Sequence, residues 1–554
     1  MCTKILLLVF FWAVSCFAQD TLFHNGLFYT AEPSSATSRW MHVRDGKILA
    51  LGDQQTLPKN FSGNRVDLKG DVVIAGLTDS HVHLMSRGEE LSQIDLRGAK
   101  SAEEASQKVA LALRSSPNEN GIIVGNGWDQ SEWPGQDFPN RSLLDKIATS
   151  RPIILYRIDG HAAWVNTSAL RKSGLWLKKT DPKGGKIARD PKGIPTGILL
   201  DTAMAPVSAL IPPVSQHKAE KYLELAVREA LKFGITSVHD AGVGANELEA
   251  IRRLLASGRV KFRFYEMLSG ASLPELRTFL KKGIETGSFQ DQLTVRTVKL
   301  FQDGAMGSRG AAFHSAYADD KENKGLLRFS KTDLEKLVTE IDAAGFQVAI
   351  HAIGTLANES AIDAYEKVLG KQVASKRPRL EHAQVLNEKD VARVGKLGII
   401  ASMQPTHCTS DMKWVEARIG KERARFAYAW KSLLDANVKL AFGSDVPVES
   451  FNPWLGWFAA VTRQDSQFHP EGGFFPKERL TRQEAYDAFT RGGAYAAFSE
   501  SSRGSLAPGK WADFVRLDKD PFQVPLQEIL QIKVKETYVA GEAVYRLQDE
   551  GMSE

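Results

Sequence analysis

Residues 72–83 read Val-Val-Ile-Ala-Gly-Leu-Thr-Asp-Ser-His-Val-His, an apolar run followed by two histidines two positions apart. The run predicts a buried strand, because β-branched side chains suit a pleated surface. Side chains alternate along an extended chain, so His81 and His83 share one face and can clasp one metal ion. The stretch therefore predicts a strand that ends in a candidate metal site.

Similar short apolar runs recur along the chain, separated by segments with helical periodicity such as residues 222–233 and 332–344. Together the runs are residues 72–75, 235–239, 260–267, 294–301, 346–350, 379–382, 399–404 and 438–442. Eight strands that alternate with helices favour a parallel α/β barrel, in which the chemistry lies at the C-terminal strand ends. The long gap after the first run predicts an inserted lid or subdomain over about residues 85–230, whose Trp, Gly and Pro content favours a loop-rich cover.

Both ends of the mature chain have the pattern of β-structure. Residues 40–43 and 47–51 alternate apolar and polar side chains around Asp45-Gly46, which is typical of a tight hairpin. Residues 511–517, 537–539 and 544–545 have the same pattern. We expect the two ends to share one sheet.

The N-terminus has the features of a secretory signal: Lys4, an apolar run over residues 5–14, and small residues up to Ala18. We expect residues 1–18 to be a signal peptide and the protein to be secreted or periplasmic. Acylation of Cys16 in a lipoprotein box, or a buried N-terminal strand, are the alternatives. No later stretch is apolar enough to cross a membrane. After cleavage Cys408 is the single cysteine, so no intrachain disulfide can form.

The composition argues against a disordered, collagenous or coiled-coil protein. Of 554 residues, 43% are hydrophobic and 25% charged, which is ordinary globular composition. The net charge is only +5 and no long basic run occurs, so nothing indicates a nucleic-acid partner. We expect a small-molecule substrate, and a homodimer is compatible with the sequence.

Further ligand-type residues stand at the ends of other predicted strands. His351 ends the fifth run, His382 ends the sixth, and Asp445 lies just beyond the eighth. With His81 and His83 they converge on one rim of the barrel, which packing alone does not require. The pattern predicts a functional metal site.

Lys299 ends the fourth run between Val298 and Leu300, on a strand that should face the barrel interior. Burial favours a neutral amine, which can react with carbon dioxide to form a carbamate. Such an anion would bridge two cations about 3.5–4 Å apart. An ion pair between Lys299 and Asp303 or another carboxylate is the alternative.

These residues lie in motifs that resemble the amidohydrolase superfamily, and in particular its family 3, the branch similar to N-substituted formamide deformylase. The opening motif is Ala75 to Leu84, and the closing element comprises Gly504-Ser505-Leu506, Pro508-Gly509-Lys510 and Ala512-Asp513. The motifs between them are Gly127-Trp128-Asp129-Gln130, Asp159-Gly160-His161, Val298-Lys299-Leu300-Phe301, Asp303-Gly304-Ala305, Gly307-Ser308-Arg309-Gly310, His351-Ala352-Ile353-Gly354, Glu381-His382-Ala383-Gln384, Gln404-Pro405-Thr406-His407 and Phe442-Gly443-Ser444-Asp445.

The resemblance implies a TIM-type (β/α)8 barrel over residues 75–499, with a small β-sandwich built from residues 19–74 and 500–554. It implies that His81, His83 and Asp445 hold one divalent metal ion and that His351 and His382 hold a second. Lys299, N6-carboxylated, would bridge the two ions, and zinc is the expected metal. The catalytic residues would then be Asp445, Lys299 and His382. A metal-bridging hydroxide would attack a carbonyl carbon, and Asp445 would pass the proton to the leaving nitrogen.

The chain departs from the family pattern at two places. Thr355-Leu356 follow Gly354 where the family commonly has Asp-Arg, which puts the substrate preference in doubt. Cys408 follows His407 where a small apolar residue is usual; we expect a buried, inert thiol there.

Several residues are candidates for substrate binding. Trp128 and Trp164 would supply aromatic walls, whereas Arg157, His161 and Arg309 would bind a polar group or polarise the carbonyl. The alternative is that the tryptophans form the core of the insertion and the arginines make surface ion pairs. We expect His239, Asp240 and His407 to orient metal ligands rather than coordinate directly.

Three functions remain open. The leading one is a metal-dependent hydrolase of a non-peptide C–N bond in an amide, N-substituted formamide or cyclic amide. The second is a mononuclear deaminase of the same superfamily, which needs no carboxylated Lys299. The third is a non-catalytic barrel used for binding, although the presence of all six ligand-type residues argues against it.

Overall fold

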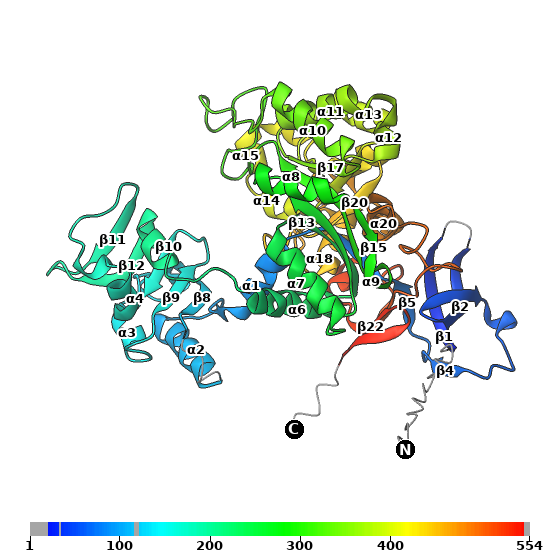
Figure 1. The fold of residues 1–554 in the computed structure, drawn as a ribbon, viewed down its shortest axis with the longest axis horizontal. Helices are drawn as coiled ribbons and strands as arrows, with labels where there is room; N and C mark the ends of the chain where they lie inside the picture. Colours follow the sequence, from blue (N-terminus) through cyan, green and yellow to red (C-terminus); the bar gives the residue numbers. More distant parts are fainter. Residues whose placement is uncertain (1–19, 33–34, 116–120, 548–554) are drawn as a thin grey trace, which may run out of the picture. The chain divides into compact units, whose positions relative to one another are not determined.

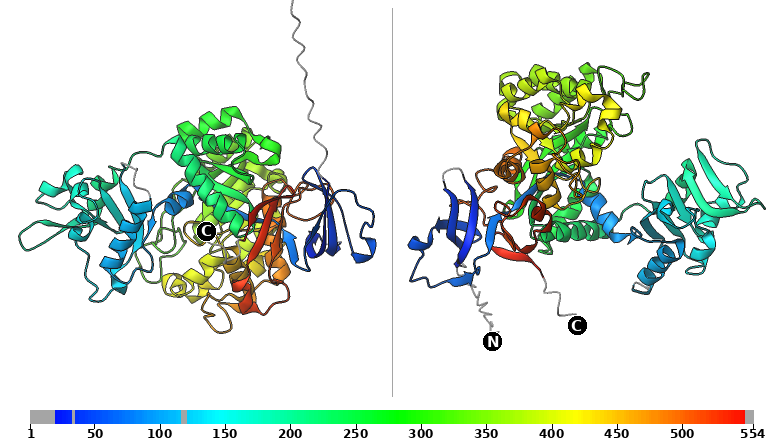
Figure 2. Two further views of the ribbon diagram at one scale, coloured as in Figure 1. Left: turned by 90° about the horizontal axis from the view of Figure 1, so that it is seen from below. Right: turned by 180° about the vertical axis from the view of Figure 1, so that it is seen from behind.

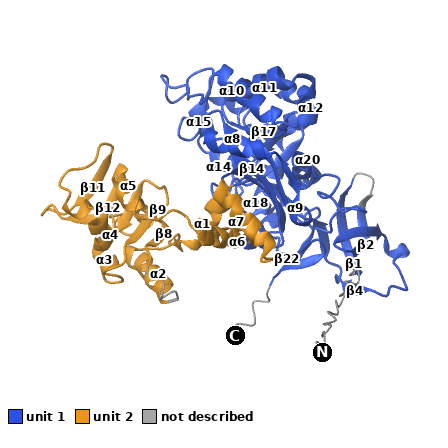
Figure 3. Ribbon diagram, viewed as in Figure 1, with its two compact units in different colours: residues 1–82, 228–244, 261–554 blue, residues 83–227, 245–260 orange. Residues whose placement is uncertain are grey.

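The computed structural model describes residues 20–32, 35–115 and 121–547. The predicted signal peptide and Cys16 lie outside the described residues. The chain divides into two compact units: unit 1 comprises residues 1–82, 228–244 and 261–554, and unit 2 comprises residues 83–227 and 245–260 (Figure 3). Within the described residues, no helix is long and apolar enough to cross a membrane.

Unit 1 contains the predicted parallel barrel. Its strands, each paired in parallel with the next, are β6 (Leu77–Val82), β13 (Ile235–Val243), β14 (Arg263–Ser269), β16 (Leu293–Phe301), β17 (Gln347–Ala352), β18 (Arg379–His382), β19 (Ile400–Met403) and β20 (Leu440–Phe442). Between β20 and β6 the backbone N–H of Asp445 donates to the His81 carbonyl at 2.7 Å. The TIM-type barrel is therefore confirmed, and the C-terminal strand ends meet at one rim.

The first barrel strand differs from the expected one. Residues 72–75 form β5 (Val72–Ala75), which pairs with β1 and β21 of the terminal sheet rather than with the barrel. The barrel strand is the motif itself, β6, in which every residue is buried. Gly76 separates the two strands and donates its N–H to Asp513 O at 2.9 Å. The apolar run at residues 72–75 therefore misplaced the first barrel strand. The strand was missed because its polar residues are buried as fully as its apolar ones.

Helices follow the barrel strands as expected for this fold (Figure 1). The predicted helix at 332–344 is α10 (Lys331–Ala343); the Ser330 hydroxyl caps its N-terminus by accepting the Asp333 N–H at 3.2 Å. The other helices of unit 1 are α8 (Leu273–Lys282), α9 (Ser288–Asp291), α11 (Thr355–Leu369), α12 (Val373–Lys376), α13 (Glu388–Leu397), α14 (Pro405–Asp411), α15 (Val415–Ile419), α16 (Lys421–Ala424), α17 (Trp430–Asp435), α18 (Pro453–Thr462), α19 (Arg482–Phe489) and α20 (Arg491–Ala496), and the short strand β15 (Glu285–Gly287) pairs with β16.

The two ends of the chain share one continuous sheet, as expected (Figure 2). Its strand order is β23-β22-β21-β5-β1-β2-β3, with β4 beside β1. Asp45 and Gly46 both have positive φ, the conformation that the predicted two-residue hairpin requires. The strands are β1 (Thr21–Glu32), β2 (Ser35–Arg44), β3 (Lys47–Gly52), β4 (Asn64–Asp67), β21 (Phe514–Leu517), β22 (Val534–Val539) and β23 (Glu542–Arg546).

Unit 2 has a sheet and hydrophobic clusters of its own, so it is not the loop-rich cover that its composition predicts. The sheet order is β11-β12-β10-β9-β8-β7. The strands are β7 (Ile94–Asp95), β8 (Ile123–Trp128), β9 (Ile153–Arg157), β10 (Ala162–Val165), β11 (Gly185–Arg189) and β12 (Pro195–Asp201). Its helices are α1 (Leu84–Ser92), α2 (Ala102–Ser115), α3 (Arg141–Asp145), α4 (Thr167–Lys172), α5 (Ala205–Ser208) and α7 (Ala245–Ala256), and α6 (Gln216–Lys232) crosses the boundary between the units.

Candidate metal centre

The predicted ligands lie together at the C-terminal rim of the barrel. One ligand atom from each of His81, His83 and Asp445 lies within 4.8 Å of the others. The ring of His382 lies 4.7 Å from the ring of His81 and 4.5 Å from the ring of His351, between centroids. These residues come from or directly follow β6, β17, β18 and β20, so parallel barrel geometry brings together positions far apart in sequence.

A buried carboxylate orients His81. His81 donates from Nδ1 to Glu381 Oε2 at 2.5 Å, and both side chains are completely buried. Burial alone would raise the pKa of the Glu381 carboxyl, but Arg379 and His81 hold that pKa below its usual range. The Arg379 guanidinium lies 2.6 Å from Glu381 Oε1. Because the carboxylate accepts the Nδ1–H, the ring proton stays on Nδ1 and the lone pair of Nε2 faces the site. This tautomer of histidine can bind a metal ion through Nε2.

His351 and His382 have the same tautomer as His81. His382 donates from Nδ1 to the side-chain oxygen of Gln404 at 2.9 Å. His351 hydrogen-bonds to the backbone of Gly304, and its buried Nε2 has no hydrogen-bond partner among the described residues. In both residues the donating nitrogen is occupied and the lone pair remains for a cation.

Burial keeps these imidazoles neutral. It lowers the pKa of His81 to about 4 and that of His351 to about 3, and it holds the pKa of His382 well below its ordinary value. Neutral imidazole is the metal-binding form. The donor set therefore fits divalent metal ions of the kind that take nitrogen and oxygen ligands.

Asp445 links the two sides of the centre. Its Oδ1 lies 3.6 Å from His81 Nε2, and its Oδ2 lies 3.9 Å from His382 Nδ1. Asp445 and His382 both have positive φ, 61° and 74°, a conformation that is costly for residues other than glycine and is concentrated at functional sites. The strain is held in place by the backbone hydrogen bond from Asp445 to His81.

Lys299 is completely buried at the same centre. Its Nζ donates to His81 Nε2 at 3.2 Å and lies 4.6 Å from the centroid of the Phe301 ring. Burial lowers the pKa of the ammonium to about 8. The alternative partner, Asp303, instead accepts the backbone N–H groups of Ala312, Ile353 and Gly354.

Three residues expected near the centre play different parts. His239 accepts a guanidinium N–H of Arg379 at 3.0 Å, and Arg379 is a partner of Glu381 rather than a predicted metal ligand. His407 is buried, and one of its ring nitrogens lies within 4.8 Å of a ligand atom of His382 and of Asp445. Cys408 is buried, and burial raises its pKa to about 11, as expected for an inert thiol.

Arg309, a predicted substrate-binding residue of unit 1, follows β16 in the motif 307–310 and is paired with a carboxylate. Its Nη2 donates to Asp319 Oδ2 at 3.0 Å, and about a third of its side chain is exposed. This is the ion pair that the sequence left open as the alternative.

The other four substrate-binding candidates belong to unit 2. Trp128 and Trp164 are fully buried in its hydrophobic core, and the Trp128 indole donates to Leu155 O at 2.8 Å. Arg157 is paired with Asp129 at 2.6 Å and with Asp159. His161 is 76% exposed and lies 2.9 Å from Asp201. Core packing and ion pairs account for these positions within unit 2.

Thr355, one of the two departures from the family pattern, begins α11 and is buried. Its hydroxyl lies 3.1 Å from His314 Nδ1, and the N–H of Leu356 donates to Ala312 O at 3.0 Å. A hydroxyl contact and a backbone hydrogen bond thus stand where the family commonly has a charged pair.

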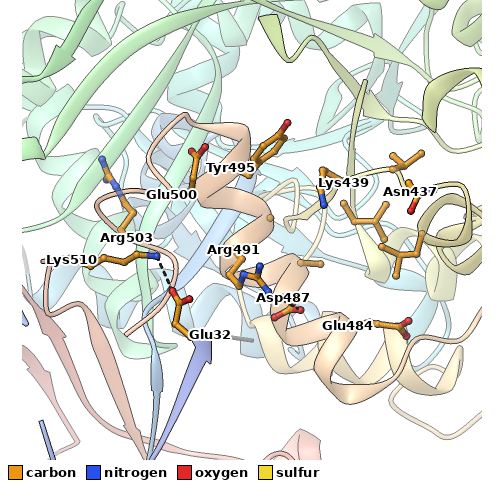
Figure 4. A pocket seen from close by; sticks show the side chains of 15 residues that line it. Glu32, Asn437, Lys439, Glu484, Asp487, Arg491, Tyr495, Glu500, Arg503 and Lys510 are labelled. Carbon is orange, nitrogen blue, oxygen red and sulfur yellow. Dashed lines mark hydrogen bonds and ion pairs between the residues drawn. The ribbon is translucent and has the colours of Figure 1, made fainter. Parts of the chain in front are cut away.

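A separate cavity of about 460 Å³ lies at the N-terminal end of β20, whereas Asp445 follows the C-terminal end of that strand. Figure 4 shows the side chains that line the cavity. Lys439, just before β20, is among its lining residues, and Lys510 pairs there with Glu32 at 3.1 Å. None of the predicted metal ligands lines it.

Glu381 and Arg379, together with the amides of Gln384 and Gln404, were not predicted as site residues. A signal for the first two exists: they stand at alternate positions of a strand whose residues are all buried. Charged side chains at such positions must find a buried partner. The identity of that partner, 300 residues away in sequence, has no signal in the strand itself.

The fold and the site define an amidohydrolase-type barrel, and comparison with known proteins agrees. A model of the amidohydrolase family matches residues 65–545, so the chain belongs to the amidohydrolase family. It is 35% identical over 544 residues to Protein LONG AFTER FAR-RED 3 of Arabidopsis thaliana, covering 95% of this chain and 91% of that protein. It is 26% identical over 535 residues to the N-substituted formamide deformylase of Arthrobacter pascens, covering 94% and 98%. An uncharacterized metal-dependent hydrolase from Pyrococcus furiosus superposes with a TM-score of 0.75 at 31% identity, covering 91% of this chain and all of that one.

Proposed function

We propose that this protein is a metal-dependent hydrolase that cleaves a non-peptide C–N bond in an amide, an N-substituted formamide or a cyclic amide. The observation that carries the proposal is the convergence of neutral, buried imidazoles with Lys299 and Asp445 on one barrel rim. Membership in the amidohydrolase family supports hydrolysis. The metal dependence of the Pyrococcus relative and the formamide chemistry of the Arthrobacter relative support the class of reaction.

In this proposal His81, His83 and Asp445 hold one ion, and His351 and His382 hold a second. The expected metal is zinc, which when bound supplies an activated water and a Lewis acid for the carbonyl oxygen. Lys299 joins the two sets as a carbamate. The lowered pKa of Lys299 supports this step, because only the neutral amine adds to carbon dioxide; as the N–C bond forms, the amine nitrogen releases one of its own two protons to solvent.

Asp445 is placed to move the proton. Its carboxylate lies near His81 on one side and near His382 on the other, and so between the two proposed ligand sets. It takes a proton from the attacking water and gives it to the nitrogen as the C–N bond breaks. The backbone hydrogen bond to His81 holds the carboxylate in this position.

A mononuclear deaminase is the second candidate. His81, His83 and Asp445 alone form a complete three-ligand set, which needs no carbamate on Lys299. Three protein ligands with one open position are sufficient for a catalytic metal site.

Metal stoichiometry separates the two candidates. Elemental analysis of the purified protein, reconstituted with zinc and bicarbonate, should give two ions per chain in the wild type and fewer in Lys299→Ala. Lys439→Ala, at an exposed lysine of the separate cavity, is the matched control and should retain both ions. One ion per chain that is indifferent to Lys299 would favour the deaminase, and no ion would reject both.

We also propose that the protein is exported by its N-terminal signal. The support is the sequence pattern of residues 1–18. Mass spectrometry of the mature protein should find Gln19 at the N-terminus. An acylated Cys16 would identify a lipoprotein, and an intact Met1 would reject export by this signal.

A further inference from the structure

His407 presents its ring nitrogen Nε2 to the metal centre, and this nitrogen has no hydrogen-bond partner among the described residues. His407 lies on α14, the helix after β19, and only 8% of the residue is exposed. Its Nε2 lies 3.6 Å from Asp445 Oδ2, beyond hydrogen-bond range. Its ring is stacked on that of His382, with centroids 6.0 Å apart. A buried polar atom without a partner, pointing toward a reaction centre, requires an explanation.

The side chains of two glutamines give His382 and His407 different tautomers. His382 donates from Nδ1 to the carbonyl oxygen of the Gln404 side chain at 2.9 Å. The amide nitrogen of Gln384 donates to Nδ1 of His407 at 3.2 Å. A neutral imidazole carries one proton, so His382 presents a lone pair at Nε2, whereas His407 presents an N–H there. His81 and His351, whose Nδ1 atoms are also occupied as donors, match His382 and not His407.

We propose that His407 is a catalytic residue whose Nε2–H donates a hydrogen bond to the substrate carbonyl oxygen as negative charge develops on it. The inference rests on the proposed function. When water adds to a carbonyl carbon, the π electrons of the C=O bond move onto the oxygen. A preorganised N–H donor in a buried site stabilises that charge without reorganisation. The other candidate donor of unit 1, Arg309, is already paired with Asp319.

Kinetics and a non-reactive anion test the donor. Substrates are 4-nitroformanilide and 4-nitroacetanilide, whose hydrolysis releases 4-nitroaniline. We expect kcat of His407→Ala to fall on the order of 10²-fold, with KM and metal content unchanged, because the donor acts on the transition state. His407→Gln, whose amide can still donate, should lose less. Phenylphosphonate, a tetrahedral anion, should bind His407→Ala at least about tenfold more weakly than wild type, whereas planar benzoate should change little.

Cys408→Ala is the matched control, because Cys408 is buried on the same helix and its thiol contributes no proposed chemistry. It should retain kcat, phosphonate affinity and metal content. Loss of an ion in both His407 variants would make His407 a ligand of the group it forms with His382 and Asp445, and would overturn the proposal. Unchanged phosphonate affinity would also overturn it. If the wild type leaves both anilides intact, the C–N proposal fails for these substrates, while the phosphonate comparison still tests His407.

Discussion

At the scale of single residues, Glu381 determines which nitrogen of His81 faces the centre. It lies between His81 and Arg379, and all three side chains are completely buried. Taking these groups out of water is costly, and the cost is offset only while every charge keeps its partner. The buried arrangement therefore costs free energy of unfolding, and in return it orients His81 as a metal ligand.

Replacing Glu381 tests its contributions to the free energy of unfolding and to metal binding. In Glu381→Gln the amide keeps the shape but leaves the Arg379 charge uncompensated, so we expect a loss of about 3–5 kcal/mol in the free energy of unfolding. Affinity for zinc, measured by chelator competition, should fall about 10–100-fold. Glu500→Gln, at a half-buried carboxylate paired with Arg377, is the control for ordinary ion-pair loss. Zinc affinity equal to wild type would show that His81 needs no carboxylate.

Lys299 should govern the stability of the metal-free protein at alkaline pH. Burial lowers its pKa from 10.5 to about 8. Between these values the unfolded chain keeps a proton that the folded chain has released, so the free energy of unfolding rises with pH across this window and the penalty is full below it. Lys299→Met should lose this rise and gain on the order of 3 kcal/mol at pH 7. Urea unfolding from pH 7 to 10.5 measures both effects, and parallel curves for the two proteins would contradict the assignment.

At the scale of elements, the loops after β16 and β17 are joined by one side chain. Asp303 follows β16 and accepts backbone N–H groups from Ala312 at 2.9 Å, Ile353 at 3.0 Å and Gly354 at 2.8 Å. The last two lie directly after β17, which carries His351. The Oδ1 atom of Asp303 also lies 3.5 Å from His351 Nε2. Loop structure and ligand position are therefore coupled at this point.

Removing Asp303 should loosen both loops together. In Asp303→Ala three buried N–H groups lose their acceptor, at about 1–3 kcal/mol each, so we expect a clear fall in melting temperature. Hydrogen exchange should accelerate at residues 312, 353 and 354. Asp303→Asn retains one acceptor oxygen and should be intermediate. Protection of these amides at wild-type levels in Asp303→Ala would show that the loops have another support.

At the scale of the whole molecule, a buried ion pair within unit 1 ties the barrel to the terminal sheet. Arg263 of β14 is 1% exposed and donates from Nε and Nη2 to Asp513, which precedes β21. Asp513 also accepts the N–H of Ala540 at 2.8 Å. A bidentate pair of this kind fixes geometry as well as distance.

Breaking this pair should destabilise unit 1 strongly. Asp513→Ala leaves the Arg263 charge buried and unpaired, so we expect a loss of about 3–5 kcal/mol in the free energy of unfolding. The exposed pair of Lys431 and Asp435 is the comparison, and Asp435→Ala should cost no more than about 1 kcal/mol. Denaturant unfolding measures both. Equal losses would mean that the buried pair is no stronger than a surface one.

The sequence by itself predicted the barrel, its catalytic rim and six candidate ligands. This was feasible because strand periodicity is local and because parallel strands place their C-terminal residues on one edge. The hairpin at Asp45-Gly46 and the cap at Ser330 were predictable for the same reason, since each depends on a few consecutive residues. The first barrel strand was misplaced because burial of β6 depends on its neighbours and not on its own polarity.

Only the tertiary structure decided which nitrogen each histidine presents. Glu381 reaches His81 across 300 residues, and Gln404 and Gln384 cross between the ends of β18 and β19 to hold His382 and His407 in opposite tautomers. Those contacts depend on the strand register of the closed barrel. Sequence therefore sets which ligand types are available, whereas the packing of distant strands sets the proton positions that determine whether each ligand binds a metal ion or donates a hydrogen bond.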